Sequence, residues 1–377
     1  MKQGWEIKKL GEIATYINGY AFKPEHWGED GLPIIRIQNL NNPNAEFNYC
    51  SLDVPDKYVI DNGDILISWS ASLGVYEWNQ GKAYLNQHIF KVLFNKIDIN
   101  KFFFKYAIGA KIKDMIKNAH GATMKHIVKG DFDNTPIPVP PLPVQEQIVS
   151  ELDLLSGIIE KKREQLKELN ALAQSIFYDM FGDPITNEKG WEVKKLGEVS
   201  KSQIGLTYKP ENVTDNNEGV IVLRSGNIQD STLCFEDVIR VNCKINETKY
   251  IKDGDILMCS RNGSAKLVGK VAMVSKLSEP MTFGAFMTII RSDYQQYLFA
   301  FFKSQAFRQQ LTSSKTATIN QITVKMLDEI LVTLPPLPLQ HQFATKIEAI
   351  EKQKELIKQS ISETETLFNA RMQEHFG

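Results

Sequence analysis

Apolar residues recur with the spacing of a coiled coil in two long stretches of the chain, residues 143–182 and 338–377. In the first stretch, steps of four and three residues alternate through Ile148, Leu152, Leu155, Ile159, Lys162, Leu166, Leu169, Ala173, Ile176 and Met180. In the second stretch, the same alternation runs through Phe343, Ile347, Ile350, Lys354, Ile357, Ile361, Thr364, Phe368, Arg371 and His375. Such a narrow seam, with a period of about 3.5 residues, predicts a helix that pairs with another helix.

Both stretches belong to a longer internal repeat. A proline-rich lead-in precedes each seam, at 140–143 and at 335–338, and the same step of 195 residues separates the two lead-ins and the two glycines, Gly182 and Gly377. The start Trp5-Glu6 returns as Trp191-Glu192, and Gly63-Asp64-Ile65-Leu66 returns as Gly254-Asp255-Ile256-Leu257. Repetition in a constant order predicts one structural unit used twice.

Between these landmarks, short β-branched and aromatic runs alternate with Gly, Asn, Asp and Pro, which is typical of strands and turns. We expect strands at 32–38, 63–69, 87–94 and 255–260, and helices at 101–118 and 294–313. The predicted fold class is α+β. Two globular domains with mixed or antiparallel sheets are separated by an intramolecular antiparallel coiled coil of two long helices, in a pseudo-two-fold repeat.

The connections suggest four segments and the orientation of the helices. The expected segments are domain 1 at 1–142, helix 1 at 143–182, domain 2 at 183–337 and helix 2 at 338–377. Only a short segment that begins with Asp183-Pro184, residues 183–190, separates the end of helix 1 from the second start. Because domain termini usually lie close together, helix 2 should begin near the end of helix 1 and run antiparallel to it. The proline lead-ins could be polyproline ligands, but their position before both helices favours stiff spacers.

Composition narrows the functional class. The net charge of −1 does not indicate a globally basic nucleic-acid binder, and the four cysteines show no metal-ligand spacing. They are expected to be reduced thiols of a cytoplasmic protein. No apolar run of membrane-spanning length occurs, so no membrane association is expected. Phosphate-binding loops, dinucleotide fingerprints, H-E-x-x-H and the [DN]-P-P-[YF] tetrapeptide are absent, which indicates a non-catalytic chain that binds no metal and no cofactor itself.

Two locally basic segments point to DNA. Residues 101–130 hold seven lysines against one acid, Asp114, and residues 294–325 hold four bases and no acid. A lysine run is often only a solvated helix face. Its recurrence in both halves adds weight to phosphate contacts, and both interpretations stay open. The candidates taken from these segments are Lys111, Lys113, Lys125, Lys303, Arg308 and Lys315.

Candidates for reading bases are side chains that can pair with base edges, on loops that differ between the halves. In domain 1 they are Lys23, Arg36, Gln38, Asn39, Trp69, Ser70, Gln87 and His88. In domain 2 they are Lys209, Arg224, Asn227, Arg261, Asn262 and Ser264. The loop 261–264 follows a predicted buried strand and is the most suggestive of them.

The doubled order of these motifs resembles the specificity (S) subunits of Type I restriction-modification enzymes over essentially the whole chain. The resemblance rests on the Trp-Glu starts, the Gly-Asp-Ile-Leu strands, residues 85–90, the PPLPxQxQ helix starts and the Phe181-Gly182-Asp183-Pro184 exit. It implies two target recognition domains, each reading half of a split sequence in double-stranded DNA. It also implies that the helices set the spacer and dock two methyltransferase (modification) subunits.

In that family the partner subunits would carry S-adenosylmethionine, and ATP-dependent restriction subunits with ATP and Mg would complete the nuclease. The resemblance does not extend to every stretch. Gly284-Ala285-Phe286 replaces Asn86-Gln87-His88 in the second half, so a role of the latter need not transfer.

Two other classes remain open at this level. A free-standing DNA-binding regulator predicts tight specific binding without a modification subunit, which the net charge of −1 does not favour. A structural coiled-coil adaptor predicts no preference for DNA, and the recurrent basic segments count against it.

Overall fold

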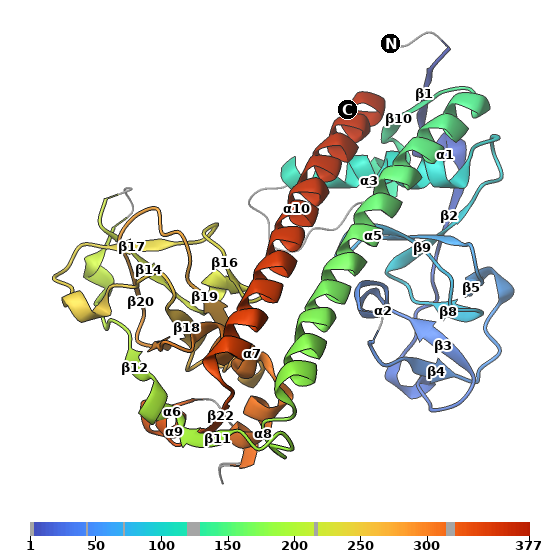
Figure 1. The fold of residues 1–377 in the computed structure, drawn as a ribbon. Coiled ribbons are helices and arrows are strands. Elements are labelled where there is room, and N and C mark those ends of the chain that lie inside the picture. The colour runs from blue at the N-terminus through green and yellow to red at the C-terminus, as the bar shows by residue number, and fades with distance from the viewer. Residues whose placement is uncertain (1–3, 43, 71, 119–128, 215–217, 314–320) are drawn as a thin grey trace. The chain divides into compact units, whose positions relative to one another are not determined.

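Each heptad stretch forms one long helix, α5 (Leu142–Phe181) and α10 (Leu337–Phe376), of 40 residues each (Figure 1). The structure, a computed structural model, describes residues 4–42, 44–70, 72–118, 129–214, 218–313 and 321–377, without the side chains of 113–118 and 313. The chain divides into unit 1, Met1–Arg163 with Lys358–Gly377, and unit 2, Glu164–Ile357. Each unit therefore contains one globular domain and part of both long helices. The predicted division into four segments, at 1–142, 143–182, 183–337 and 338–377, stays a prediction.

The helices pair in both units, as the seam predicts, and the pairing is antiparallel. In unit 1, Glu151 lies 2.7 Å from Arg371, while Arg163, further along α5, lies 2.7 Å from Glu365, earlier in α10. In unit 2, the ring of Phe181 at the end of α5 lies 5.0 Å from that of Phe343 in the first turns of α10. All predicted seam positions are buried or half-buried.

The two lysines of the seam have hydrogen-bond acceptors. Lys162 donates to the hydroxyls of Ser360 and Thr364, which belong to the facing helix of unit 1. Lys354, only 5% exposed, lies 2.7 Å from Glu351 on its own helix. A buried ammonium needs such acceptors. Because the partners of Lys162 lie across the helix pair, this lysine favours one register.

In the residues that the structure describes, unit 1 contains two four-stranded sheets and a two-stranded one. The first sheet has the order β2-β9-β6-β7, the second β4-β3-β8-β5, and β1 pairs with β10. One pair, β3 with β8, is parallel and the rest are antiparallel. The strands are β1 (Glu6–Lys9), β2 (Thr15–Asn18), β3 (Leu32–Ile35), β4 (Asn48–Cys50), β5 (Val59–Ile60), β6 (Ile65–Ser68), β7 (Gly74–Glu77), β8 (Ala83–Leu85), β9 (Ile89–Leu93) and β10 (Pro136–Val139). The helices besides the long pair are α1 (Leu10–Ile13), α2 (Ile37–Asn41), α3 (Lys101–Asn118) and α4 (Lys129–Asp133).

Unit 2 repeats this plan. Its sheets have the orders β12-β21-β18-β19 and β13-β17-β14-β20, with the pairs β11-β22 and β15-β16, and again one parallel pair, β14 with β20. The strands are β11 (Glu192–Lys195), β12 (Lys201–Ile204), β13 (Val213–Thr214), β14 (Val220–Leu223), β15 (Ile228–Gln229), β16 (Thr232–Leu233), β17 (Ile239–Val241), β18 (Ile256–Cys259), β19 (Val271–Met273), β20 (Met281–Phe283), β21 (Met287–Arg291) and β22 (Leu331–Leu334). The helices are α6 (Leu196–Val199), α7 (Gln295–Lys303), α8 (Gln305–Ser313) and α9 (Val324–Asp328). The α+β class with mixed sheets is thus confirmed.

Each proline lead-in, at 140–143 and 335–338, directly follows a strand, β10 or β22, and continues into a long helix. Residues 136–139 form β10, whose only partner among the described strands is β1, with Ile7 opposite Pro138. Proline fits an edge strand because its missing N–H is not needed on the unpaired side. The glutamine of each PPLPxQ motif is buried and donates to the first proline's carbonyl, Gln145 to Pro140 at 2.8 Å and Gln340 to Pro335 at 2.7 Å. These bonds attach each helix start to its domain.

Two predicted elements differ from those observed. The strand expected at 32–38 ends at Ile35, and Gln38 and Asn39 lie on the short helix α2. The helix expected at 294–313 is broken at Ser304, whose hydroxyl donates to the carbonyl of Phe301 and accepts from the N–H of Phe307. A serine that bonds to nearby backbone groups competes with a continuous helix, so α7 and α8 are separate. The helix expected at 101–118 is α3.

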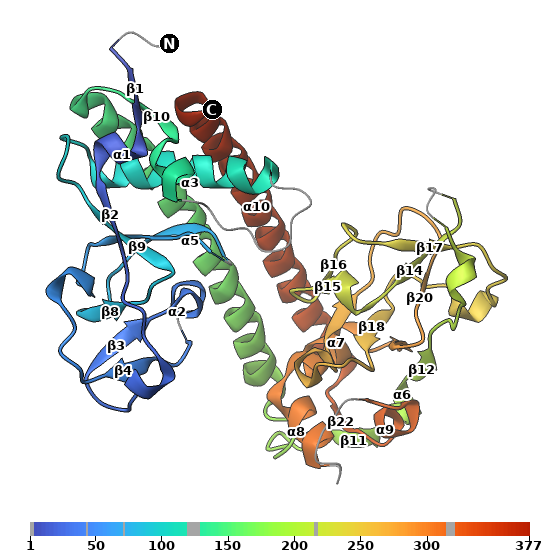
Figure 2. The same ribbon diagram turned by 180° about the vertical axis from the view of Figure 1, so that it is seen from behind.

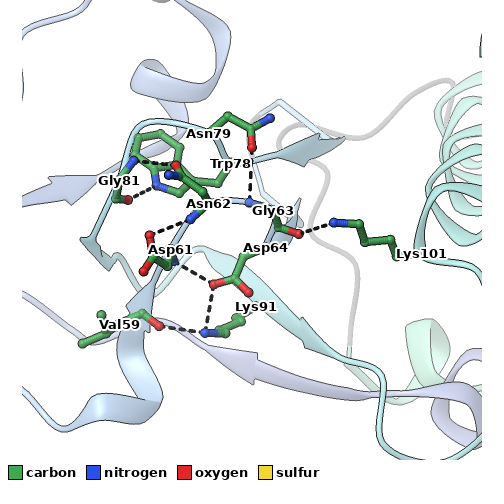
Figure 3. Close-up of polar contacts among 10 residues, drawn as sticks. All are labelled: Val59, Asp61, Asn62, Gly63, Asp64, Trp78, Asn79, Gly81, Lys91 and Lys101. Atoms are coloured by element: carbon green, nitrogen blue, oxygen red, sulfur yellow. Dashed lines mark hydrogen bonds and ion pairs between the residues drawn. The ribbon is translucent and has the colours of Figure 1, made fainter.

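The repeated Gly-Asp-Ile-Leu landmark is a structural turn. Gly63 has φ +83°, which favours glycine, and its N–H donates to the carbonyl of Trp78 at 2.7 Å. The carboxylate of Asp64 accepts from the N–H of Asp61 and pairs with Lys91, at 2.9 Å each (Figure 3). In unit 2, Gly254 has φ +86°, and Asp255 accepts from Lys252 and pairs with Arg291.

Each domain core includes the end of a long helix. In unit 1, Phe376 is 1% exposed and lies 5.4 Å from Phe103 of α3, ring to ring. In unit 2, Phe181 is 1% exposed and lies 5.0 Å from Tyr297 of α7. The heptad seam did not predict either residue. The last turn of each helix is therefore part of a globular core.

We expect Phe376→Ala to destabilise unit 1 and Phe181→Ala to destabilise unit 2, each by about 3–5 kcal/mol, because a buried ring is replaced by a cavity. Hydrogen exchange measured by mass spectrometry would locate the lost protection in 10–152 for the first variant and in 196–332 for the second. The exposed Leu367→Ala is the control. Equal loss of protection in both domains for either variant would contradict the assignment.

Candidate nucleic-acid interface

Three loops of unit 2 meet beside its sheets. One loop follows β12, the second follows β14, and the third connects β20 to β21. The N–H of Leu206 donates to Phe283 at 2.6 Å, and the N–H of Gly284 donates to Leu223 at 2.9 Å, so backbone bonds hold the loops together. They enclose a hollow of about 540 Å³ whose lining includes Tyr208, Arg224 and Phe286.

The equivalent loops of unit 1 have the same backbone bonds. Tyr20 donates from its N–H to Leu85 at 2.7 Å, and Asn86 donates to Ile35 at 3.1 Å. One more backbone hydrogen bond recurs in both units: the N–H of Ile89 donates to the carbonyl of Asn86 in unit 1, and the N–H of Met287 donates to the carbonyl of Gly284 in unit 2. The structure therefore brings together segments far apart in sequence: the start of α2 with Arg36 and Gln38, and the loop between β8 and β9 with Gln87 and His88.

Arg261 is the candidate with the most favourable surroundings for reading a base. It is exposed, and its guanidinium carbon lies 5.3 Å from the centre of the Phe286 ring. Its backbone N–H donates to the carbonyl of Phe286 at 3.0 Å. Phe286 is itself 58% exposed, which is unusual for a phenylalanine. A stacked guanidinium keeps its planar donor edge directed outwards, as bidentate pairing requires.

The other candidates on the same surface differ in whether their side chains already form hydrogen bonds or ion pairs within the protein. Arg224 lies 3.1 Å from the carboxylate of Asp237. Asn262 donates to Ser225 at 3.0 Å and accepts from the N–H of Ser264, so it shapes its loop. Ser264 is exposed. Of this group, Arg261 and Ser264 present their side chains most openly.

Asn39 and Asn227 hold loops in place. The side-chain oxygen of Asn39 accepts from the N–H of Arg36 at 3.1 Å, and its amide donates to Ala45 and Glu46. Asn227 accepts from the N–H of Arg224 at 2.8 Å and also donates to two backbone carbonyls. They are 4% and 2% exposed. Burial leaves them no open polar edge for a base.

In unit 1, Trp69 and His88 form an aromatic pair with ring centres 5.5 Å apart, and the indole N–H of Trp69 donates to Asn18 at 3.2 Å. Ser70 is 5% exposed, so burial separates it from solvent. Gln38 and Gln87 are exposed. The guanidinium of Arg36 lies 5.4 Å from the ring centre of Trp27.

Lys23 and Lys209 occupy matching turns in the two units. Lys23 lies 3.6 Å from Glu25, and Lys209 lies 3.3 Å from Glu211. Both lysines are more than two-thirds exposed, so solvent screens these pairs strongly. A phosphate could displace either carboxylate at small cost.

The basic segments are only partly described. Lys111 is half-buried and Lys303 is exposed, with its amine 5.0 Å from the Phe299 ring centre. Arg308 is exposed but donates to the carbonyl of Val268 at 2.6 Å. The side chains of Lys113, Lys125 and Lys315 lie outside the described residues.

Phe286 and Trp27 were missing from the sequence candidates. Each lies under an arginine that was selected, Arg261 and Arg36 respectively. Alignment of the two halves places Phe286 at the position of His88, and this substitution was the available signal. For Trp27, the exposed fraction of 40% was needed, which only the structure gives.

Two observations on the described residues bear on catalysis and metal binding. Burial raises the pKa of the Cys259 thiol, the opposite of what a nucleophilic cysteine requires. Among the described residues, no group of three or more His, Cys, Asp or Glu side chains is placed to hold a metal. None of the helices in the described parts of the chain is long and apolar enough to cross a membrane.

Comparison with known proteins identifies relatives along the whole chain. A family model described as Type I restriction modification DNA specificity domain matches residues 2–171 and again residues 188–366. The Type I restriction enzyme EcoBI specificity subunit of Escherichia coli is 22% identical over 92% of this chain and 79% of its own length. The solved S subunit of a Type I restriction-modification system from M. genitalium shares the fold, with a TM-score of 0.54, 14% identity and coverage of 99% and 96%.

A second solved chain, from work on complex assembly and conformational transition of the type I R-M system, has a TM-score of 0.59 and 17% identity. It covers 100% of this chain and 98% of its own. At these identities the two solved chains show a shared fold.

The loop role of Asn39 can be separated from base reading. We expect Asn39→Ala to lower the free energy of unfolding by about 1–3 kcal/mol without DNA, because three backbone groups lose a buried partner. The exposed neighbouring change Gln38→Ala should alter it by less than about 0.5 kcal/mol. Urea denaturation of both variants provides the measurement. Equal stability of the two variants would argue against the loop role.

Proposed function

The chain belongs to the family of Type I restriction-modification DNA specificity subunits, and from this we propose that each of its two domains reads one half of a split DNA target. As a specificity subunit, it is the non-catalytic part of its complex. The paired helices set the separation of the half-sites and dock two modification subunits. Those subunits bind S-adenosylmethionine and methylate adenine in the cytoplasm. Restriction subunits that use ATP and Mg would complete a nuclease.

One observation carries the proposal that the domains read different sequences. The same backbone frame recurs in both units but carries different side chains at the same places. Arg36-Ile37-Gln38-Asn39 matches Arg224-Ser225-Gly226-Asn227, with both asparagines holding the loop. The next loop changes from Asn86-Gln87-His88 to Gly284-Ala285-Phe286. A fixed frame with variable exposed groups supports one docking geometry and two specificities.

The domain surfaces also differ in how they would contact DNA. Unit 1 presents the amides of Gln38 and Gln87, which suit an adenine edge. Unit 2 presents Arg261 on an exposed ring, which suits a guanine edge. Lys23 and Lys209, at matching turns, suit the phosphate backbone.

The helix pair suits a role as a ruler. Each helix has 40 residues, or roughly 60 Å at 1.5 Å per residue. The bond from Lys162 to Ser360 and Thr364 opposes slippage of the pair. Neither helix contains proline after its first turn. A pair held in one register would convert helix length into a defined spacing on DNA.

The proposal as a whole is tested by co-expressing the chain with Type I modification subunits from the same organism, followed by methylome sequencing. We expect a co-purifying complex and a methylated split motif that is lost when the chain is deleted. A chain that binds a specific DNA sequence tightly alone, without such a complex, would instead support a free-standing regulator.

Arg261→Ala should weaken recognition of one half-site only, by about 1–3 kcal/mol if the guanidinium pairs with guanine. The change removes the donor edge but leaves the loop bonds of Asn262 intact. Competition binding against a library randomised in each half-site provides the measurement. Lys209→Ala is the matched control, with a loss expected to be uniform across sequences. A uniform loss for Arg261→Ala would make it a phosphate contact instead.

Removal of one matched heptad, residues 163–169 with residues 355–361, should shorten the preferred spacer and leave both half-sites unchanged. Seven residues correspond to about 10 Å of helix, or about three base pairs of DNA. Methylation of a DNA library with varied spacers measures the preference. An unchanged spacer would refute the ruler. Removal from one helix only is the control, because it disrupts the seam without shortening the pair.

A further inference from the structure

The internal repeat provides a position-by-position comparison of the two ends of the helix pair. The 195-residue step matches Phe376 with Phe181, Phe368 with Ala173 and Ser156 with Glu351. The matching rings of Phe103 and Tyr297, which contact Phe376 and Phe181, align α3 with α7. On this alignment, Tyr106 of α3 corresponds to Ala300 of α7.

In unit 1, a tyrosine fills the space between α3 and the helix pair. The ring of Tyr106 lies 6.2 Å from that of Phe368. Its hydroxyl donates to the carboxylate of Asp153 at 2.6 Å and lies 3.5 Å from the hydroxyl of Ser156. Burial, followed by the hydrogen bond to Asp153, raises the pKa of Tyr106 to about 12, so the hydroxyl stays a donor at neutral pH. The cleft beside it, lined by residues including Ser156 and Phe368, measures about 310 Å³.

In unit 2, alanine stands at both matching positions: Ala300 matches Tyr106, and Ala173 matches Phe368. A hollow of about 450 Å³ lies there, which we name the aromatic socket; its lining includes Ala173, Phe177, Phe299, Ala300, Phe343 and Glu351. The three phenylalanines provide apolar walls. Glu351, at the position of Ser156, supplies a carboxylate at the wall and also accepts from Lys354 at 2.7 Å. The socket thus has the space and the acceptor for a group that unit 1 provides from its own chain.

We propose that the aromatic socket receives a tyrosine side chain from a modification subunit docked on the helix pair in unit 2. The occupant follows from unit 1, where a hydroxyphenyl ring takes the equivalent position and its hydroxyl is held by acidic and hydroxyl groups of α5. The docked subunit is that of the proposed function, on which this inference rests. Because Tyr106 and Phe368 already fill the matching space, the modification subunit at unit 1 docks without this insertion. The two docking sites are therefore unequal.

The test refills the socket with the residue that unit 1 carries. Ala300→Tyr introduces the ring from α7, and Ala173→Phe introduces one from α5, so a fold defect in one variant leaves the other usable. Ala265→Tyr is the matched control, since Ala265 is exposed in unit 2, lies off the helix pair and is outside the socket lining. Saturation-transfer NMR with p-cresol, the tyrosine side chain as a free molecule, reports whether the socket accepts the ring. We expect binding to the unaltered chain and to the control, and loss in both refilled variants.

Docking is then measured by native mass spectrometry of the full chain titrated with modification subunits. We expect the unaltered chain and the control to bind two copies. Each refilled variant should bind one copy normally and the second copy at least about tenfold more weakly. This is the loss expected for one aromatic side chain that is no longer buried. Equal binding of both copies by the refilled variants would overturn the proposal. Loss of p-cresol binding with unchanged docking would also overturn it, because the socket would then take a free ring only.

Failure of the proposed function has a different signature. In that case the unaltered chain, the control and the refilled variants all bind no modification subunit. The unequal docking expected here appears only as a difference between the refilled variants and the other two proteins.

Discussion

The burial of Phe181 and Phe376, the residues that end the two long helices, is the constraint on which the rest of the structure depends. A heptad seam can slide by whole turns at modest cost because each step of the seam resembles the next. A phenylalanine that completes a globular core cannot slide, because its ring has one position against Tyr297 or Phe103. The ends of the helices are therefore held by the domains, and the hydroxyls that accept from Lys162 support the same register.

This attachment also explains the arrangement of the proline segments. Strand β10 pairs with β1, so the beginning and the end of the first globular domain lie side by side. Gln145 then holds the first turn of α5 to Pro140, and the same arrangement recurs with β11, β22 and Gln340. Such bonds suit the proposed role of the helix pair as a ruler, since a loosely attached helix start would lose the information in helix length. The candidate DNA-contacting loops can differ in sequence between the two units because none of these contacts involves them.

Much of the fold and part of the candidate site follow from sequence. The heptad period and the 195-residue step were sufficient for the helix pair and the repeat. The short connection after helix 1 indicated the antiparallel direction, and the alternation of strand and turn residues indicated two α+β domains. The site was predicted as a set of loops, and these loops do meet in space. Individual residues were less predictable. Asn39 and Arg261 are both polar loop residues, but one is buried in backbone hydrogen bonds and the other stacks on an exposed ring.

The sequence by itself determined the periodic features, because a seam or a repeat is written into the spacing of residue types. Tertiary structure decided whatever depends on which side chains share a space. The break at Ser304, the strand made by the prolines and the burial of Asn39 each reflect a competition among backbone partners that one-dimensional spacing does not show. The aromatic socket is the clearest case. Ala173 and Ala300 are 127 residues apart and unremarkable in sequence, and only packing against the same helices leaves the space of a missing ring between them.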